Sequence, residues 1–332
     1  MTGRSLAWVV SSLAVCSLAV SAVMAQDKVL IGHLGNPTPM QVAVAKNAFA
    51  EATGWEIEWR KFASGVDVVA AMSEGDIQIA ELGSAPLTVA ASQGVDLEIF
   101  MIAQIIGEAE SLVVRNGTGI DTIAALRHKR IAVPFGSTAH FSLMGALYRV
   151  GLTEQDVTLL DMSPDQIAAA WRREAIDGAF IWQPVQSELL TSGRLLVGAD
   201  RTAAWGYPTF DGWVVNKKFA ARNAERLAAF VRVMDEANAA YLRDPAAWTG
   251  DSTPVKTIAE RTGARPDRIP EILKGYTFLP LAKQIGPAWF GGSIAKTITY
   301  TAGFLTAAGM IDSVAEDYRG FVNAELTQAA MK

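Results

Sequence analysis

The sequence predicts an α/β protein built from two similar lobes. Short apolar segments of strand length alternate with longer segments of helical periodicity, which is the pattern of parallel βαβ units. This alternation occurs in the first third of the chain and again in the middle third. The chain has 332 residues, which is too long for one ordinary hydrophobic core. We therefore expect two bodies, each with a mainly parallel sheet flanked by helices.

The predicted elements of the two sets follow the same order. The first set consists of KVLIGHL at 28–34, a helix at 41–53, IEWRKF at 57–62, a helix at 65–73 and IQIAEL at 77–82. The second set consists of RIAVPF at 130–135, a helix at 140–150, VTLLDM at 157–162, a helix at 164–173 and GAFIW at 178–182. Two lobes of similar construction follow from this repetition.

Two similar apolar segments flank the middle third and predict how the lobes are joined. SLVVRN at 111–116 and GWVVNK at 212–217 each precede a polar turn and a helix. We interpret them as two hinge crossings. The predicted division is lobe one at 26–114 plus 213–332 and lobe two at 115–212. Lobe one is completed by helices predicted at 223–242, 253–262, 266–275 and 293–308.

The first 25 residues have the composition of a cleaved export signal. Arg4 precedes an apolar run at 6–23, and Val23-Met24-Ala25 suits cleavage near Ala25. Serines interrupt the run, which disfavours a membrane anchor. Val15 stands where lipid attachment to Cys16 would need a small residue. We predict an exported protein.

Charge and cysteine content exclude several function classes. The formal net charge is −5 and no basic run occurs, which argues against nucleic acid and anionic membranes as partners. Cys16 is the only cysteine, so a processed chain has no disulfide and no thiolate nucleophile. His33, His128 and His140 are too scattered for a metal cluster. We expect no metal, no cofactor and no catalytic residue.

Three strand-to-helix turns carry the polar residues that are candidates for ligand binding. They are Gly83-Ser84, Ser137-Thr138 and the turn that contains Trp182. Helix starts attract anions through free N–H groups and the helix dipole, and ligands of open α/β sheets bind at such turns. Ordinary helix capping by Ser and Thr is the alternative interpretation. His140 is either a packing residue of its helix start or a ligand contact.

Acidic and aromatic residues near the crossings indicate a ligand with a cationic end. Glu108 and Glu110 precede the first crossing strand, and Asp211 precedes the second. Trp205 is a candidate for an aromatic wall around an ammonium group near Asp211. Solvated loop carboxylates and core aromatics remain the alternatives.

Five longer segments resemble one protein family. They are residues 59–87, 129–143, 169–184, 205–220 and 286–298, which include ELGSAPL, AVPFGSTAHFSL, GAFIWQP, YPTFDGWVV and GPAWFGGS. They resemble the periplasmic substrate-binding proteins of ABC importers for taurine, aliphatic sulfonates, nitrate and thiamine precursors. The resemblance covers nearly the whole processed chain. It implies the type II two-lobe fold, a monomer, and delivery of taurine or a similar aminosulfonate to an importer permease.

The resemblance also implies roles for individual residues. Ser84, Ser137 and Thr138 would hold the sulfonate with backbone amides, including that of Gly83. Glu110, Trp182 and Asp211 would surround the amine and the carbon chain. Gln41 is a candidate contact in a loop that departs from the family pattern, as does Ala139.

Two alternatives to taurine binding remain open. One is another small sulfonate, a sulfinate or a phosphonate, such as hypotaurine, isethionate, an alkanesulfonate or aminoethylphosphonate. The other is an enzyme, because relatives on this scaffold include a desulfinase and enzymes of thiamine-pyrimidine synthesis. Both enzymatic resemblances depend on cysteine, which the processed chain lacks.

Overall fold

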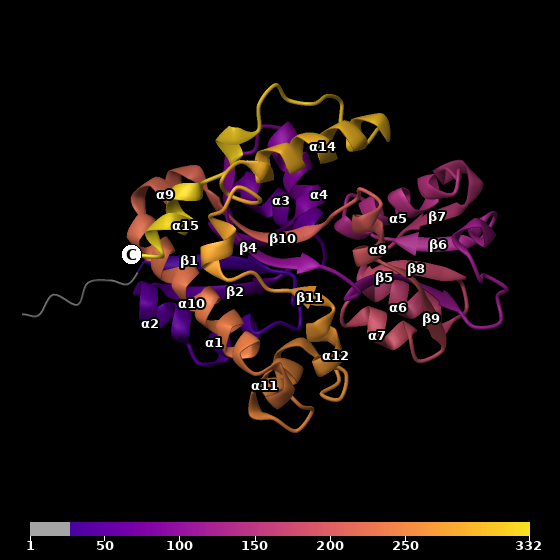
Figure 1. Ribbon diagram of the computed structural model, residues 1–332, viewed down its shortest axis with the longest axis horizontal. Coiled ribbons are helices and arrows are strands. Elements are labelled where there is room, and N and C mark those ends of the chain that lie inside the picture. Colours follow the sequence, from indigo (N-terminus) through magenta and orange to yellow (C-terminus); the bar gives the residue numbers. More distant parts are fainter. Residues whose placement is uncertain (1–26) are drawn as a thin grey trace, which may run out of the picture.

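The computed structural model of the protein describes residues 27–332, so the predicted signal peptide lies outside the described residues. Two separate β-sheets, each covered by helices, lie side by side (Figure 1). Among the described residues, no helix is long and apolar enough to cross a membrane. We call the larger sheet and its helices lobe one, and the smaller sheet and its helices lobe two.

Lobe one contains a six-stranded sheet in the order β11-β4-β10-β3-β1-β2. Its strands are β1 Lys28–His33, β2 Glu56–Lys61, β3 Ile79–Gly83, β4 Leu97–Ile106, β10 Phe210–Asn216 and β11 Tyr276–Thr277. Its helices are α1 Met40–Ala45, α2 Ala48–Thr53, α3 Gly65–Glu74, α4 Ser84–Ser92, α9 Lys217–Arg222, α10 Ala224–Arg243, α11 Thr253–Thr262, α12 Ile269–Lys274, α13 Leu281–Gln284, α14 Ser293–Ala307 and α15 Ala324–Ala329.

Lobe two contains a five-stranded sheet in the order β7-β6-β8-β5-β9. Its strands are β5 Glu110–Arg115, β6 Arg130–Val133, β7 Thr158–Asp161, β8 Gly178–Trp182 and β9 Gly193–Gly198. Its α-helices are α5 Thr138–Arg149, α6 Pro164–Arg172, α7 Val185–Leu189 and α8 Ala199–Ala204. Short 3₁₀ turns in the two lobes are η1 Ile123–Leu126, η2 Glu154–Asp156, η3 Pro245–Ala247 and η4 Arg319–Phe321.

The two sheets are mixed, although the sequence predicts mainly parallel ones. The βαβ units pair in parallel as expected, β1 with β2 and β3, and β6 with β7 and β8. The strands next to the crossings pair antiparallel: β10 lies between β3 and β4, and β5 lies between β8 and β9. A strand that enters from the other lobe is not part of a right-handed βαβ unit, so parallel pairing is not imposed on it.

The chain changes sheets a few residues earlier than the predicted division at 114/115 and 212/213. β4 of lobe one ends at Ile106 and β5 of lobe two begins at Glu110, while α8 of lobe two ends at Ala204 and β10 of lobe one begins at Phe210. Residues 107–109 and 205–209 therefore form the two crossings. β4 is not among the strands predicted from the sequence. Because β4 is missing from that prediction, β5 is assigned to lobe one in its place, and the predicted division falls too late in the chain.

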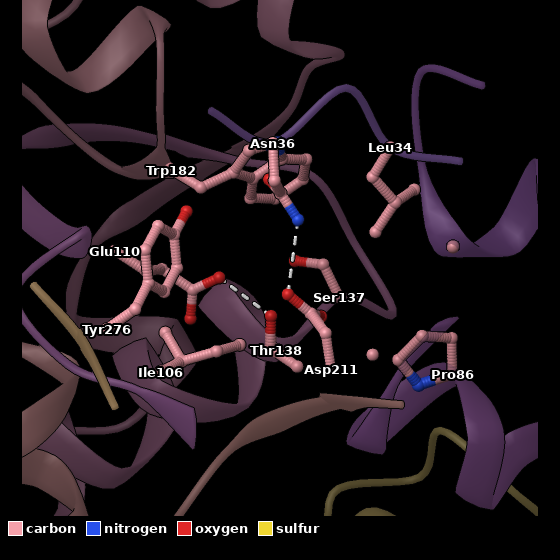
Figure 2. Close-up of a pocket in the computed structure, with 12 residues that line it drawn as sticks. Leu34, Asn36, Pro86, Ile106, Glu110, Ser137, Thr138, Trp182, Asp211 and Tyr276 are labelled. Atoms are coloured by element: carbon pink, nitrogen blue, oxygen red, sulfur yellow. Dashed lines mark hydrogen bonds between the residues drawn. The ribbon is translucent and has the colours of Figure 1, made fainter. Parts of the chain in front are cut away.

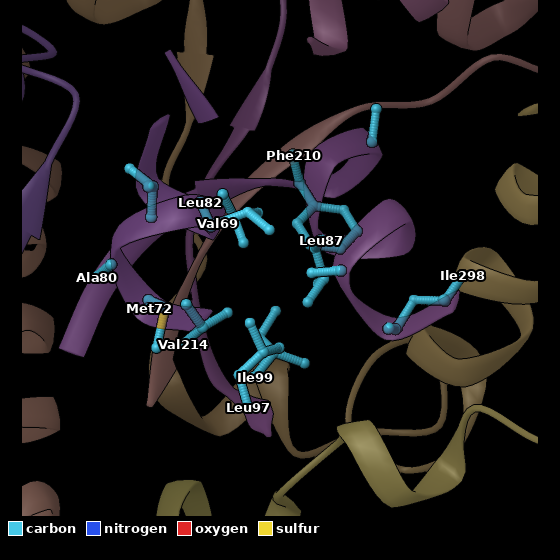
Figure 3. Packing of buried hydrophobic residues seen from close by; sticks show 14 of the residues in the cluster. Val69, Met72, Ala80, Leu82, Leu87, Leu97, Ile99, Phe210, Val214 and Ile298 are labelled. Atoms are coloured by element: carbon cyan, nitrogen blue, oxygen red, sulfur yellow. The ribbon is translucent and has the colours of Figure 1, made fainter. Parts of the chain in front are cut away.

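Both faces of each sheet are packed against helices. In β10, Val214 belongs to a cluster with α3, α4 and α14, whereas Trp213 and Val215 belong to a cluster on the opposite face with α1, α2 and α10. Figure 3 shows the first cluster, in which Val214 lies near residues of β3 and β4. In β5, Val113 likewise faces one cluster, and Leu112 and Val114 face another. Doubly covered strands explain the continuous apolar segments in the sequence.

One predicted helix is broken. The helix expected at 41–53 is divided into α1 and α2 because Asn47 adopts a left-handed conformation with φ of 57°. Asparagine tolerates this region better than most residues, since its short polar side chain bonds locally. α11 matches its predicted range, and α3, α6, α10 and α14 match theirs within a residue or two at each end.

Candidate functional site

A small cavity lies where the two lobes meet. The empty space there, open solvent at the mouth included, is ≈ 400 Å³. Figure 2 shows the lining side chains from both lobes. They are Leu34, Asn36, Gly65, Gly83, Pro86, Ile106, Asp211 and Tyr276 of lobe one, and Glu110, Ser137, Thr138 and Trp182 of lobe two.

Three helices begin at the wall of this cavity. α3 begins at Gly65, α4 follows its N-cap Gly83, and α5 follows its N-cap Ser137. Each helix follows a strand of its own sheet, so all three begin at the carboxyl edges of the sheets. The first N–H groups of a helix have no partner within it and carry partial positive charge. This wall of the cavity therefore suits an anionic group.

The start of α4 lies close to the start of α5 across the boundary between the lobes. A Cβ atom at Gly83 would lie 2.9 Å from Cγ2 of Thr138 and 3.4 Å from Oδ1 of Asp211. Any larger residue at position 83 would force these neighbours apart. Gly83 thus lets the two lobes approach each other beside the cavity.

Two carboxylates of lobe one are bound by the same pair of side-chain amides. Asn36 Nδ2 donates to Glu81 Oε1 at 3.0 Å and to Asp211 Oδ2 at 3.2 Å. Gln104 Nε2 donates to the same two oxygens at 2.9 and 2.8 Å. The backbone N–H of Leu34 donates to Glu81 Oε2 at 3.1 Å. Uncharged amides hold this acidic pair, and both carboxylates are buried.

Glu110 supplies a third buried carboxylate from lobe two. Its Oε2 accepts a hydrogen bond from Thr138 Oγ1 at 2.7 Å (Figure 2). Its Oε1 is buried and has no hydrogen-bond partner within the described residues. This oxygen is therefore free to accept a hydrogen bond from a donor on a bound ligand.

Burial and mutual repulsion raise the pKa of two of these carboxyls. Desolvation raises the pKa of Glu110 to about 8, against the hydrogen bond from Thr138 that lowers it. Desolvation first, and then the charges of Glu81 and Glu110, raise the pKa of Asp211 well above its usual range. No lysine, arginine or histidine is among the described residues that line the cavity. A cation bound there would favour the ionised carboxylates.

The structure brings six of the sequence-predicted site residues to the cavity wall and places four away from it. Gly83, Glu110, Ser137, Thr138, Trp182 and Asp211 line the cavity. The other four predicted residues are Ser84, Gln41, His140 and Trp205. That the six contact a ligand stays a prediction.

Each of the four residues away from the wall has another contact. Ser84 Oγ accepts a hydrogen bond from Phe210 N–H at 3.3 Å, and Gln41 donates to the carbonyl of Asn36 behind the cavity wall.

Of the remaining two, His140 lies in lobe two and Trp205 lies at the start of the second crossing. His140 packs behind Ser137, and Trp205 packs against the core of that lobe. In this structure these four side chains are therefore not part of the cavity wall.

Several lining residues are absent from the sequence-predicted set. Asn36 and Gly65 follow predicted strands, so the rule that selects Gly83 and Ser137 could have selected them as well. Glu81 and Gln104 support the wall through hydrogen bonds, and nothing local in the sequence marks Gln104. Tyr276 comes from a two-residue strand far along the chain, so only the tertiary structure could place it.

Comparison with known proteins identifies relatives over most of the chain. The family model described as NMT1/THI5 like matches residues 35–247. The taurine-binding periplasmic protein of Escherichia coli (strain K12) is 38% identical over 313 residues, which cover 94% of this chain and 97% of that protein.

Solved structures share the two-lobe fold. The alkanesulfonate-binding protein SsuA from Xanthomonas axonopodis pv. citri bound to MOPS aligns with a TM-score of 0.76 and 22% identity, covering 91% of this chain and 100% of that one. The desulfurization enzyme DSZB aligns with a TM-score of 0.64 and 15% identity, covering 92% of this chain and 99% of that one. The chain therefore belongs to the NMT1/THI5-like family, and almost its whole length is related to a periplasmic taurine-binding protein.

Proposed function

We propose that this protein is an extracytoplasmic solute-binding protein that binds taurine or a closely similar small aminosulfonate and delivers it to an ABC importer. The observation that carries the proposal is the set of buried carboxylates around a small cavity that no cationic side chain of the described residues lines. Burying ionised carboxylates without a positive partner is costly, which is why their pKa values rise, and a cation on the ligand would supply the partner that lets them ionise. An ammonium group meets this requirement.

The opposite end of the ligand would be an anion. The starts of α3, α4 and α5 line the same cavity, and Thr138 and Ser137 add hydroxyl groups there. A small molecule with an ammonium at one end and a sulfonate at the other satisfies both the carboxylates and the helix starts. The name of the Escherichia coli relative supports taurine as that molecule.

The second candidate is another small anion of similar size, and the carboxylates discriminate against part of that class. Isethionate and simple alkanesulfonates have no amine, so they would leave Glu110 and Asp211 unpaired and would be repelled by them. Hypotaurine, homotaurine and aminoethylphosphonate keep the amine and remain competitors. Specificity among them depends on the anionic group and on chain length.

We propose a binding role and no enzymatic activity. The relative named above with substantial identity is a binding protein, whereas the DSZB structures share the fold at 15–16% identity. The enzymes that the sequence resembles depend on cysteine, and residues 27–332 of this chain contain none. A thiolate nucleophile is therefore not available to the cavity.

Export, partners and domain motion are parts of the same proposal. Residues 1–25 would be removed near Ala25 on export, and the processed protein would work as a monomer in the periplasm. The two lobes would close on the ligand about residues 107–109 and 205–209 and present it to the importer permease. Mass spectrometry of the exported protein tests the cleavage site, and light scattering tests the monomer.

A thermal-shift panel tests the ligand assignment. The probes are taurine, hypotaurine, homotaurine, aminoethylphosphonate, isethionate and an alkanesulfonate. A ligand at 100 times its dissociation constant stabilises the folded state by about 2.7 kcal/mol, which gives a clear rise in melting temperature. We expect taurine to stabilise the protein and isethionate not to. Equal stabilisation by isethionate would contradict the role of the carboxylates, and no shift with any probe would exclude this substrate class.

A further inference from the structure

Two buried histidines, one in each lobe, make the same kind of contact to a glycine backbone. His33 ends β1, and its Nδ1 accepts a hydrogen bond from the N–H of Gly35 at 3.1 Å. His140 lies in the first turn of α5, and its Nδ1 accepts from the N–H of Gly136 at 3.3 Å. Both imidazoles are buried. The third histidine, His128, is exposed and makes no such contact within the described residues.

Each glycine precedes a polar residue of the cavity wall. Gly35 and Gly136 adopt left-handed conformations, with φ of 77° and 72°, which other residues rarely adopt. Asn36 follows Gly35 and binds two buried carboxylates of lobe one. Ser137 follows Gly136 and caps α5. The direction of the chain at each glycine thus decides where the next side chain meets the cavity.

The loop of lobe two is held to His140 in two ways. The ring accepts from Gly136, and the backbone N–H of His140 donates to Ser137 Oγ at 3.1 Å. Phe135 stacks on the imidazole with 4.5 Å between ring centroids, and its N–H donates to Asp161 Oδ1 at 3.0 Å. The histidine is therefore central to the contacts of this loop.

The hydrogen bonds require both rings to be neutral, with the proton on Nε2, because only a bare Nδ1 can accept. The pKa of each histidine is lowered to about 4, and burial is the largest cause at both. The positive charges of Arg261 and Lys61 contribute to the lowered pKa of His33, whereas the charge of Asp161 opposes the lowering at His140. Glu154 also faces His140, with Oε1 3.9 Å from Nε2.

We propose that His33 and His140 are matched positioning residues that hold the two loops, residues 33–36 and 134–138, in the shape that the ligand needs. Neither side chain lines the cavity, and each acts through the residue after its glycine, Asn36 or Ser137. The inference rests on the proposed function, since it takes these loops as ligand-facing. Protonation of both rings would remove both acceptors and release Gly35 and Gly136.

The first experiment needs no ligand. Nitrogen NMR of the histidine-labelled protein at pH 7 should show His33 and His140 as neutral rings with the proton on Nε2. His128 serves as the exposed internal reference. A proton on Nδ1 of His33 or His140 would overturn the proposal, whatever the protein binds.

The second experiment compares two substitutions at each histidine. Asparagine places an acceptor oxygen near the position of Nδ1, whereas leucine fills the site without an acceptor. We expect His33→Leu and His140→Leu each to weaken taurine binding about tenfold, the value of roughly one hydrogen bond, and to speed amide hydrogen exchange at Gly35 or Gly136. His33→Asn and His140→Asn should stay within about threefold of the parent protein.

The control variant replaces the exposed histidine, His128, which makes no such contact within the described residues. His128→Leu should leave taurine affinity unchanged. Equal losses in the Leu and Asn variants, or an unaffected Leu variant, would overturn the positioning role. If a Leu variant does not fold, the Asn variant and the NMR tautomers still test whether the histidine positions its loop. If the parent protein binds no taurine, the proposed function fails, while the tautomers and amide exchange still test the two hydrogen bonds.

A pH profile separates positioning from simple packing. A lowered pKa means that stability from these histidines is lost as pH falls from the usual value of 6.5 towards 4, because the unfolded chain takes up the protons first. In the folded protein, protonation near pH 4 removes the acceptors of Gly35 and Gly136, so taurine affinity should fall more steeply between pH 5 and 4 in the parent protein than in a His33→Asn/His140→Asn double variant. Identical slopes would contradict the proposal.

Discussion

The two lobes bring carboxylates to the same cavity in different states. In lobe one, Glu81 and Asp211 are bound by the amides of Asn36 and Gln104. In lobe two, Glu110 has one hydrogen bond, from a threonine hydroxyl, and its other oxygen has no partner within the described residues. Lobe one thus holds its acidic pair in place without a ligand, whereas lobe two leaves an acceptor open. We infer that, of the three carboxylates, Glu110 forms the most favourable interaction with a bound ammonium group.

Replacement of Glu110 tests this difference with the largest expected effect. Glu110→Gln removes the charge while it keeps the shape and an acceptor for Thr138. Loss of one partner of a buried charge pair costs about 2 kcal/mol or more, so taurine affinity should fall by about 30-fold or more. The melting temperature of the ligand-free protein should not fall, because the buried carboxyl has no cationic partner among the described residues. Calorimetry and thermal melts measure the two quantities.

The matched control is Glu108→Gln, which alters an exposed carboxylate two residues away. Its taurine affinity should equal that of the parent protein. If both variants lose affinity equally, general electrostatics and not the buried oxygen explain the effect. If Asp211→Asn weakens binding far more than Glu110→Gln, the comparison between the lobes is reversed.

The raised pKa of Glu110 predicts that binding depends on pH. With a pKa of about 8, Glu110 is neutral at pH 6 and must lose its proton to pair with an ammonium. Taurine affinity should rise by about tenfold per pH unit from pH 6 and level off near pH 8. The slope should decrease in Glu110→Gln, and any slope that remains belongs to Asp211. A flat profile in the parent protein would contradict an open, neutral Glu110.

The raised pKa of Glu110 also makes the stability of the ligand-free protein depend on pH. A carboxyl whose pKa rises on folding stabilises the folded state fully below its unfolded value of 4.5, and this contribution is lost as pH rises through about 8. The melting temperature of the ligand-free parent protein should therefore fall over this range relative to that of Glu110→Gln. Thermal melts of both proteins across the range measure the difference.

Gly83→Ala tests the contact between the lobes. The added methyl group would meet Thr138 Cγ2 at 2.9 Å and would hold the starts of α4 and α5 apart. We expect taurine affinity to fall about five- to tenfold, the low end of the roughly 1–3 kcal/mol typical of overpacking. The control is Gly303→Ala in α14, where a methyl group meets nothing within 4 Å. Equal affinity in Gly83→Ala would show that the lobes need not approach so closely.

Ser84→Ala should have the smallest effect. The Ser84 hydroxyl is not part of the cavity wall and accepts from the N–H of Phe210. Its removal should cost about 1 kcal/mol of stability and change taurine affinity by less than about threefold. Calorimetry of this variant therefore separates a structural hydroxyl from a sulfonate contact. A loss as large as that of Glu110→Gln would restore Ser84 to the binding site.

Much of the fold can be predicted from the sequence because its signals are local. Segments such as GAFIW at 178–182 and the helix at 253–262 have the length and periodicity of their elements, and the structure places them at those residues. β4 escapes prediction although it is the longest strand of lobe one. Its ten residues are buried on both faces, and periodicity cannot distinguish such an apolar run from a buried helix.

The candidate site can be predicted in part for the same reason. Gly83 and Ser137 follow predicted strands and Trp182 ends one, and the carboxyl edge of a sheet is where ligands of such folds bind. The same rule also selects Ser84 and His140, since composition alone does not tell which side of a turn faces the cavity. A single turn of helix directs neighbouring side chains to different sides.

The sequence by itself determined the two-lobe α/β architecture, the export-signal pattern, the absence of cysteine after residue 16 and the family resemblance. All of these depend on residues close together in the chain or on their composition. Only the tertiary structure decided that Glu81, Glu110 and Asp211 share one buried site, completed by Asn36, Gln104 and Tyr276. Two of these hydrogen bonds, from Asn36 and from Gln104 to Asp211, join residues more than 100 positions apart. Burial, which sets the pKa values of the carboxyls, arises only when the lobes pack together.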